Sequence, residues 1–119
     1  MTKQKNFTKG RYGESLALQY LKSLGYQFIQ SNFHTRYGEI DLIMIDKNKL
    51  IFIEVKYKSL NSPGTPEEMI SPKKINQILR TAQSFLTKNP DLTKDYSSYR
   101  LDAICIVGND IKHYQNISS

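Results

Sequence analysis

Two β-rich segments separated by a short turn constrain the fold of this chain more than any other feature. Residues Glu39 to Asp46 and Leu50 to Tyr57 are dense in Ile, Leu, Val and Phe, and Lys47-Asn48-Lys49 lies between them. Branched and aromatic residues at this density favour strands. Asn48 can adopt the left-handed conformation that a tight turn often needs. The two segments therefore predict an antiparallel β-hairpin.

The register of this hairpin decides which side chains share a face, because side chains alternate across a strand. A two-residue loop at Lys47-Asn48, or a four-residue loop from Asp46 to Lys49, gives the same pairs. The pairs are Ile45 with Leu50, Ile43 with Phe52, Asp41 with Glu54, and Glu39 with Lys56. A one-residue slip would send the two polar sets to opposite faces. The match of the apolar pairs favours this register, which places an apolar patch near the turn and a polar group far from it.

The polar end of the hairpin gathers three carboxylates and one ammonium group on one face. Carboxylates directly opposite each other lie about 5 Å apart at Cβ and destabilise a sheet. A divalent cation offsets this repulsion, because Mg²⁺ binds carboxylates while water and phosphate oxygens complete its shell. A second acid-x-lysine sequence, Asp110-Ile111-Lys112, has no acid on a paired strand. The residues alone favour a metal site of the nuclease type and a salt-bridged hairpin surface about equally.

The remaining segments predict one domain over residues 1–119, with flexible ends at 1–8 and 116–119. A helix from Lys9 to Leu24 ends at Gly25, and a second helix starts at Ser71-Pro72 and stops before Asn89-Pro90. A loop occupies Lys58 to Glu68. Further strands are expected at Tyr26 to Phe33, Tyr99 to Val107 and Ile111 to Gln115. This order predicts an α/β fold, a mixed sheet of about five strands flanked by helices; the order of the strands in the sheet stays open.

Charge and cysteine usage restrict the partners and the compartment. The chain has 17 basic and 11 acidic residues and a pI near 9.4, which favours a polyanion, nucleic acid before an anionic membrane surface. Apolar runs reach only the length of Ala103 to Val107, so no membrane-spanning helix is expected. No secretory signal is visible, and the single Cys105 fits a reducing compartment, the cytoplasm. His34 and His113 lack partners at zinc-ligand spacing.

Several motifs together resemble a known family. They are GRYGE at 10–14, Gly25-Tyr26, Asn32, GEIDLI at 38–43, IFIEVK at 51–56, the Pro-Gly loop, Lys74, and Arg100-Leu101-Asp102. In this combination the chain resembles the uncharacterised bacterial YraN-like proteins, from about Lys9 to Gln115. That family in turn resembles the restriction-endonuclease-like fold, which includes the archaeal Holliday-junction resolvases.

The resemblance implies a PD-(D/E)xK-type nuclease core. Asp41 and Glu54 would then ligate Mg²⁺ (or Mn²⁺), Lys56 would position or activate the attacking water, and Glu14 would complete the site. Glu14 lies at the edge of the apolar helix face, although a carboxylate near a helix start is also favourable for the helix dipole alone. The candidate contacts to nucleic acid are Arg36, Lys58, Lys73 and Lys74. For Lys73, a solvated helix face is at least as good an interpretation, whereas the resemblance favours Lys74.

These inferences lead to one expected function and two alternatives. The first is a Mg²⁺-dependent endonuclease acting on DNA, with branched and flapped DNA among the candidate substrates. The second is a nucleic-acid-binding module that keeps the fold but does no chemistry, and the third is a protein-interaction adaptor. A homodimer would suit the cutting of two strands.

Overall fold

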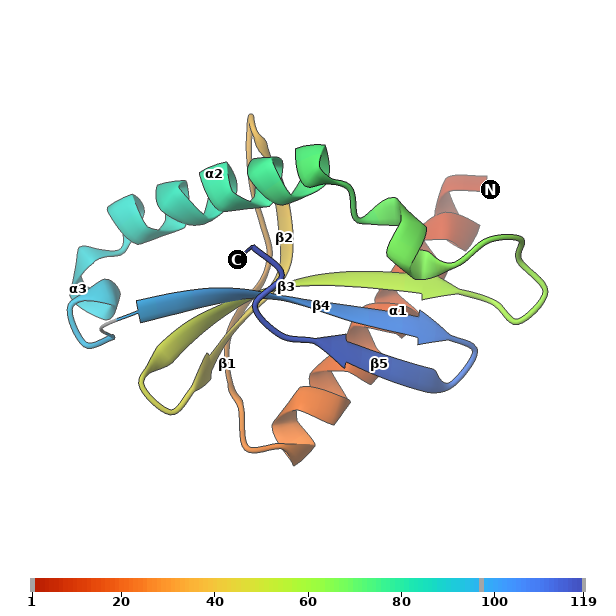
Figure 1. The fold of residues 1–119 in the computed structure, drawn as a ribbon, viewed down its shortest axis with the longest axis horizontal. Coiled ribbons are helices and arrows are strands. Elements are labelled where there is room, and N and C mark those ends of the chain that lie inside the picture. Colours follow the sequence, from red (N-terminus) through yellow and green to blue (C-terminus); the bar gives the residue numbers. More distant parts are fainter. Residues whose placement is uncertain (1, 97, 119) are drawn as a thin grey trace.

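A mixed five-stranded sheet in the order β1-β2-β3-β4-β5 forms the centre of the protein (Figure 1). The computed structural model describes residues 2–96 and 98–118, with side chains from residue 10 onward. The strands are β1 (Gln27–Thr35), β2 (Gly38–Asp46), β3 (Lys49–Lys58), β4 (Ser98–Val107) and β5 (Asp110–Tyr114). Only β3 and β4 pair in parallel; the other neighbours are antiparallel. The predicted α/β class is confirmed, and the arrangement is consistent with a restriction-endonuclease-like fold.

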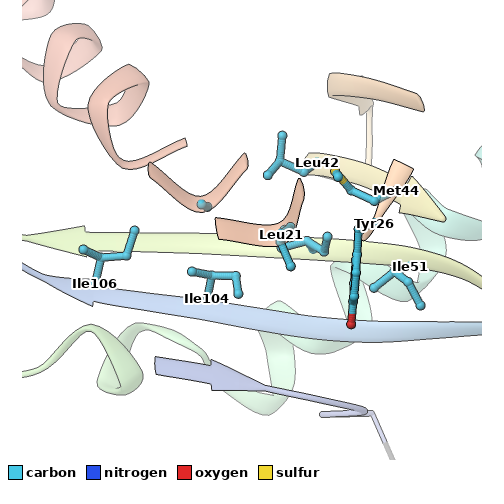
Figure 2. Close-up of a cluster of buried hydrophobic side chains, with 9 residues drawn as sticks. Leu21, Tyr26, Leu42, Met44, Ile51, Ile104 and Ile106 are labelled. Atoms are coloured by element: carbon cyan, nitrogen blue, oxygen red, sulfur yellow. The ribbon is translucent and has the colours of Figure 1, made fainter. Parts of the chain in front are cut away.

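Two long helices cover opposite faces of the sheet (Figure 1). On one face α1 (Thr2–Ser23) packs Ala17 and Leu21 against a cluster of buried residues that Figure 2 shows. On the other face α2 (Pro72–Lys88) packs Ile78, Ala82 and Phe85 against the second cluster. The sheet supplies Leu42, Met44, Ile51, Ile53, Ile104 and Ile106 to the first cluster, and Ile43, Ile45, Leu50, Phe52 and Leu101 to the second. In β3, where Ile51 and Ile53 face one helix and Phe52 the other, the alternation of side chains is regular.

The ends of the helices follow local sequence signals, with one difference. Gly25, at φ +94°, stops α1 as expected. At the start of α2, the Ser71 hydroxyl accepts a hydrogen bond from the Lys74 N–H at 3.1 Å, and Pro72 follows as the first helical residue. The prediction placed the start of α1 at Lys9, whereas the helix begins at Thr2. No proline lies between these positions, so nothing in the backbone ends the helix earlier.

Two short helices and the C-terminal segment extend the predicted outline. The loop between β3 and α2 contains the 3-10 turn η1 (Pro66–Met69), and α3 (Pro90–Thr93) follows α2. The Asn116 N–H donates to the Asp102 carboxylate at 3.0 Å, and the Ile117 N–H donates to the Leu101 carbonyl at 2.8 Å. The segment expected to be a flexible end from residue 116 is therefore tied to β4 at its first two residues.

The hairpin register is as predicted near the turn. Ile45 pairs with Leu50 and Ile43 with Phe52, which confirms the two-residue loop. The residue in the left-handed conformation is Lys47, at φ +58°, rather than Asn48. The β2–β3 ladder ends at Leu42 paired with Ile53, so the predicted backbone pairs of Asp41 with Glu54 and Glu39 with Lys56 are wrong.

No helix in the described part of the chain is long and apolar enough to cross a membrane.

Candidate functional site

The site forms where β2 and β3 separate. The Asp41 carboxylate accepts a hydrogen bond from the Val55 N–H at 2.7 Å. The Asp41 side chain thus takes the position that a backbone carbonyl of β2 would have in a regular ladder. On the other side of β2, Asn32 of β1 stands opposite Asp41 without pairing and has a φ of +55°. Asn tolerates this left-handed conformation better than most residues. Because β2 stays paired with β1 while β3 continues beside β4, a space opens between the two strands of the predicted hairpin.

A pocket of about 480 Å³ occupies this space. Helix α1 contributes Glu14, β2 contributes Asp41, β3 contributes Glu54 and Lys56, and the first turn of α2 contributes Lys74. The other lining residues are Gly10, Glu39, Val55, Tyr57 and Met69. The structure thus brings together all four residues that the resemblance assigned to catalysis, and adds Lys74 to them.

Glu54 is the most deeply buried charged side chain of the pocket, at 2% exposure. Its Oε2 atom receives no hydrogen bond of acceptable geometry from the described residues. Two ammonium groups supply the opposite charge: Lys74 Nζ lies 3.2 Å and Lys56 Nζ 3.8 Å from Oε2. A buried carboxylate oxygen that has ion pairs but no hydrogen bond of acceptable geometry is in an incomplete environment for a negative charge.

The pKa of Asp41 is raised from 3.8 to about 9. Burial is the largest cause, and the neighbouring Glu54 carboxylate adds to it, while the Val55 N–H acts in the opposite direction. As it stands the pocket therefore favours a proton on Asp41 at neutral pH, because two carboxylates this close cannot both ionise without a further positive charge.

The side-chain amide of Asn32 connects Glu14 to Glu39, another acidic residue of the pocket. The Asn32 side-chain amide lies 3.2 Å from a carboxylate oxygen of Glu14 and 3.2 Å from one of Glu39, and with its NH₂ group turned towards them it donates to both. Burial raises the pKa of Glu14, the Asn32 contact lowers it, and the charge of Glu39 raises it again. Sequence reasoning named Glu14 but did not assign Asn32 to the site. The only sign of Asn32 in the sequence was that it is one of the motif residues on which the family resemblance rests.

The donor set fits a hard divalent cation. Among the residues from 10 onward that the structure describes, no three acidic, histidine or cysteine side chains already form a closed set of ligands. Glu54 nevertheless has a buried oxygen without a directed donor, and Asp41 and Glu14 both have raised pKa values. A cation such as Mg²⁺ or Mn²⁺ relieves this repulsion, since it prefers carboxylate oxygens and keeps several waters. Asp41, Glu54 and Glu14 are the residues that would hold it.

Three residues predicted to contact nucleic acid lie outside the pocket. The Lys58 ammonium donates to the Pro63 carbonyl at 2.8 Å and so holds its own loop. Arg36 lies in the β1–β2 turn, where it contacts Tyr37, and Lys73 is exposed at the start of α2. The second acid-x-lysine copy also lies apart, with Asp110 and Lys112 exposed on β5. Discounting that copy agrees with the structure.

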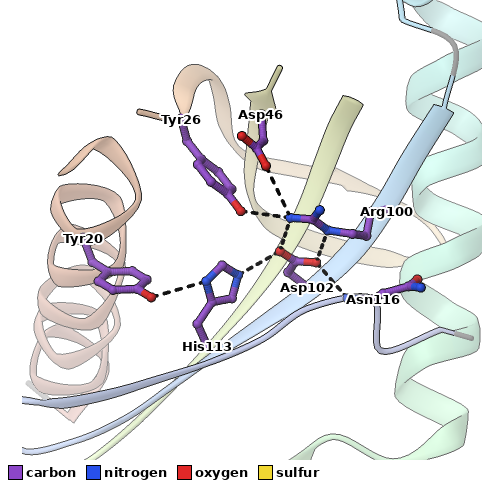
Figure 3. Close-up of polar contacts among 7 residues, drawn as sticks. All are labelled: Tyr20, Tyr26, Asp46, Arg100, Asp102, His113 and Asn116. Carbon is purple, nitrogen blue, oxygen red and sulfur yellow. Dashed lines mark hydrogen bonds and ion pairs between the residues drawn. The ribbon is translucent and has the colours of Figure 1, made fainter. Parts of the chain in front are cut away.

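A second polar cluster on β4 has a structural role (Figure 3). Arg100 donates from Nε and Nη2 to both oxygens of Asp102, at 2.8 and 3.0 Å, and His113 Nε2 lies 2.8 Å from the same carboxylate. Burial alone would raise the pKa of Asp102, but His113, Arg100 and the Asn116 N–H together hold it below its ordinary value. None of these residues lines the acidic pocket. Arg100 and Asp102 therefore form a structural pair apart from the candidate site.

The fold and the site define a small α/β protein with a carboxylate and lysine pocket between diverging strands. Residues 13–106 match the Uncharacterised protein family UPF0102, and the chain belongs to this family. A UPF0102 protein of Sulfurihydrogenibium sp. is 39% identical over 111 residues, covering 93% of this chain and 94% of the relative. A UPF0102 protein of Persephonella marina is 40% identical over 111 residues, covering 93% of each, and one of Aliivibrio salmonicida is 38% identical, covering 91% and 89%. The matched span includes every charged residue of the pocket.

Proposed function

We propose that this protein is a divalent-metal-dependent phosphodiesterase of the PD-(D/E)xK type that hydrolyses DNA in the cytoplasm. The observation that carries the proposal is the pocket in which Glu14, Asp41 and Glu54 meet beside Lys56 and Lys74. Without a cation the three carboxylates repel one another. The chain as a whole has a net charge of +6, which suits a polyanionic substrate.

Each side chain has a role that its position supports. Asp41, Glu54 and Glu14 would hold Mg²⁺ or Mn²⁺, which when bound lowers the pKa of a water and neutralises charge on the phosphate. Because the Val55 N–H fixes Asp41 and the sheet buries Glu54, both ligands are preorganised on rigid strands.

The two lysines approach the carboxylates from different elements. Lys56 lies on β3 with its ammonium 3.8 Å from Glu54, where it can hold the attacking water or a phosphate oxygen. Lys74 approaches from α2, with its ammonium 3.2 Å from the same carboxylate, and offers a second positive charge to the phosphate. The pocket therefore combines anionic ligands for a metal with cationic groups for the substrate.

A cleavage assay tests the proposal with a control that the chain itself offers. Labelled single-stranded, duplex, flapped and four-way-junction DNA are incubated with Mg²⁺ or Mn²⁺. We expect Glu54→Gln and Lys56→Met to lose at least about 100-fold in rate, as removal of one electrostatic group in an active site typically does. Asp110→Asn and Lys112→Met change the exposed second copy of the motif and should leave the rate unaltered. Equal cleavage by the pocket variants and the wild type would refute the mechanism.

One observation supports a second function, a nucleic-acid-binding module without chemistry. Lys56 and Lys74 already supply positive charge to Glu54, as a pocket that never binds a cation would require. Salt-sensitive DNA binding by the wild type, with no cleavage in any divalent metal, would select this function over the nuclease.

A further inference from the structure

The outer face of α2 carries basic residues with no acidic residue along the helix. From Pro72 to Lys88 the chain contains Lys73, Lys74, Arg80 and Lys88, and neither Asp nor Glu. Lys74 lines the acidic pocket, whereas Lys73 and Arg80 line a separate pocket of about 490 Å³ farther along the same helix. The helix therefore carries basic residues from the candidate metal site towards its C-terminal end.

The β1–β2 turn adds an aromatic ring to this basic surface. The turn lies against α2, since a Cβ atom at Gly38 would stand 3.5 Å from Thr81 Oγ1. Tyr37, 37% exposed, therefore stands beside the outer face of α2. The Arg36 guanidinium carbon lies 5.0 Å and that of Arg80 5.9 Å from the centroid of its ring. An exposed tyrosine ring with two guanidinium groups beside it offers planar groups on which a nucleobase can stack.

A pocket of about 470 Å³ opens beside this ring. We call it the Tyr37 pocket; it is lined by Tyr37, Arg80, Gln83, Ser84, Thr87 and Lys88. Its volume is in the range of small-ligand sites, roughly 300–1,000 Å³. Amide and hydroxyl groups line it together with cations at both ends, so it offers hydrogen-bond partners for the polar edges of a base and charges for the flanking phosphates. Because Arg80 lines both this pocket and the one that contains Lys73, the two are neighbours along α2.

We propose that the outer face of α2 binds single-stranded nucleic acid, with an unpaired base stacked at the Tyr37 pocket and the backbone following Arg80 and Lys73. The occupant is single-stranded because a paired base is not available to stack on a side chain. The inference rests on the proposed function in one respect, namely that the strand continues past Lys74 into the acidic pocket. Binding to the Tyr37 pocket itself requires neither a metal nor cleavage.

Local stabilisation of the turn is the competing explanation for the ring and its cations. Arg36 alone suffices for that, since its Nη2 also donates to the Tyr37 hydroxyl at 2.9 Å. Arg80 comes from a different element, and no hydrogen bond between it and the ring is needed to hold the turn. The pocket that extends from the ring to Lys88 is also not explained by the turn.

Fluorescence anisotropy in EDTA separates this surface from the metal site. The probes are labelled oligothymidine of about 20 nucleotides, the matching RNA, and a duplex. We expect Tyr37→Leu to weaken binding of both single strands by about tenfold, with a smaller effect on the duplex. Arg80→Gln should lower the slope of log affinity against log salt by about 0.7 on single strands. Both positions are exposed, and thermal melts verify that the variants fold.

Two controls make the outcome specific. Tyr114→Leu removes a tyrosine of similar exposure, 39%, at β5, and Lys47→Gln removes an exposed cation in the β2–β3 turn; neither should change affinity. Wild-type affinity in both Tyr37→Leu and Arg80→Gln, or an equal loss in the controls, would overturn the inference. If single strands bind as described but the wild type never cleaves, the nuclease proposal fails and this inference stands. If the wild type cleaves and both Tyr37→Leu and Arg80→Gln bind normally, the nuclease proposal stands and this inference fails.

Discussion

Replacing Gly13 by alanine tests how closely α1 must approach the sheet to bring Glu14 into the pocket. An ideal Cβ atom at Gly13 would lie 2.8 Å from the Cβ of Tyr57 on β3. Gly10, three residues earlier on the same helix, has no atom within 4 Å of such a Cβ. The two glycines therefore form a matched pair in which only one is required by packing.

The magnitude follows from two opposing contributions. Alanine in place of glycine in a helix gains about 0.5–1 kcal/mol of stability from backbone propensity. At Gly13 the new methyl group must move about 0.7 Å or more to reach an ordinary carbon–carbon contact, and overpacking of this kind costs about 1–3 kcal/mol. We expect Gly10→Ala to be neutral or stabilising by up to about 1 kcal/mol, and Gly13→Ala to be destabilising by about 1–2 kcal/mol.

Urea unfolding of the two variants and the wild type measures both effects. Because the propensity gain is common to both, the difference between the variants isolates the cost of the contact with Tyr57. A shift of α1 would also displace Glu14, the next residue on the helix. Mn²⁺ should therefore stabilise Gly13→Ala against unfolding less than it stabilises the wild type. If Gly13→Ala is as stable as Gly10→Ala, the close approach of α1 to β3 is refuted, and with it the placement of Glu14.

Further predictions concern the two buried carboxylate clusters. The folded protein retains a proton on Asp41 up to about pH 9, whereas the unfolded chain releases it near pH 3.8, so stability is lost as the pH rises between these values. In EDTA, Asp41→Asn should therefore raise the free energy of unfolding by on the order of 2–4 kcal/mol at pH 7 and by little at pH 4, and equal effects at both pH values would contradict the raised pKa. On β4, Asp102→Asn should cost about 3 kcal/mol in thermal or urea unfolding, because Arg100 is left without its buried partner. The control Asp46→Asn, whose carboxylate is 26% exposed and 3.9 Å from Arg100, should cost less than about 1 kcal/mol; similar losses would show that the buried pair has no special role. The pKa of Asp102 lies below its ordinary value, so its contribution to stability should persist above pH 4 and disappear only as the pH falls through that lowered pKa.

The sequence predicted the elements well where local chemistry decides them. The Ser71 cap, the Gly25 stop and the alternation of Ile51, Phe52 and Ile53 all depend on residues within one turn or strand, and all appear in the structure. The start of α1 was predicted too late in the chain. The residues before Lys9 are mostly polar and include no proline, so they neither extend the apolar pattern of the helix nor end it.

The site was predicted in composition but not in geometry. Regular pairing would have placed Asp41 directly opposite Glu54, whereas the ladder ends at Leu42 and Asp41 instead accepts the Val55 N–H. Periodicity cannot reveal where two strands separate, because that depends on a side chain competing for a backbone partner and on the left-handed Asn32 across β2. The contact of Lys74 with Glu54 could not be predicted either, since the path of the loop between β3 and α2 sets it.

Thermal unfolding during a titration with Mg²⁺ or Mn²⁺ tests the central claim most directly, namely that Glu14, Asp41 and Glu54 form a metal site. The wild type should gain stability with rising metal concentration, by about 2.7 kcal/mol at 100 times the dissociation constant. Glu54→Gln and Asp41→Asn should lose most of this gain, and Asp110→Asn should keep all of it. A wild type that the metal does not stabilise, or an equal gain in the pocket variants, would contradict the claim.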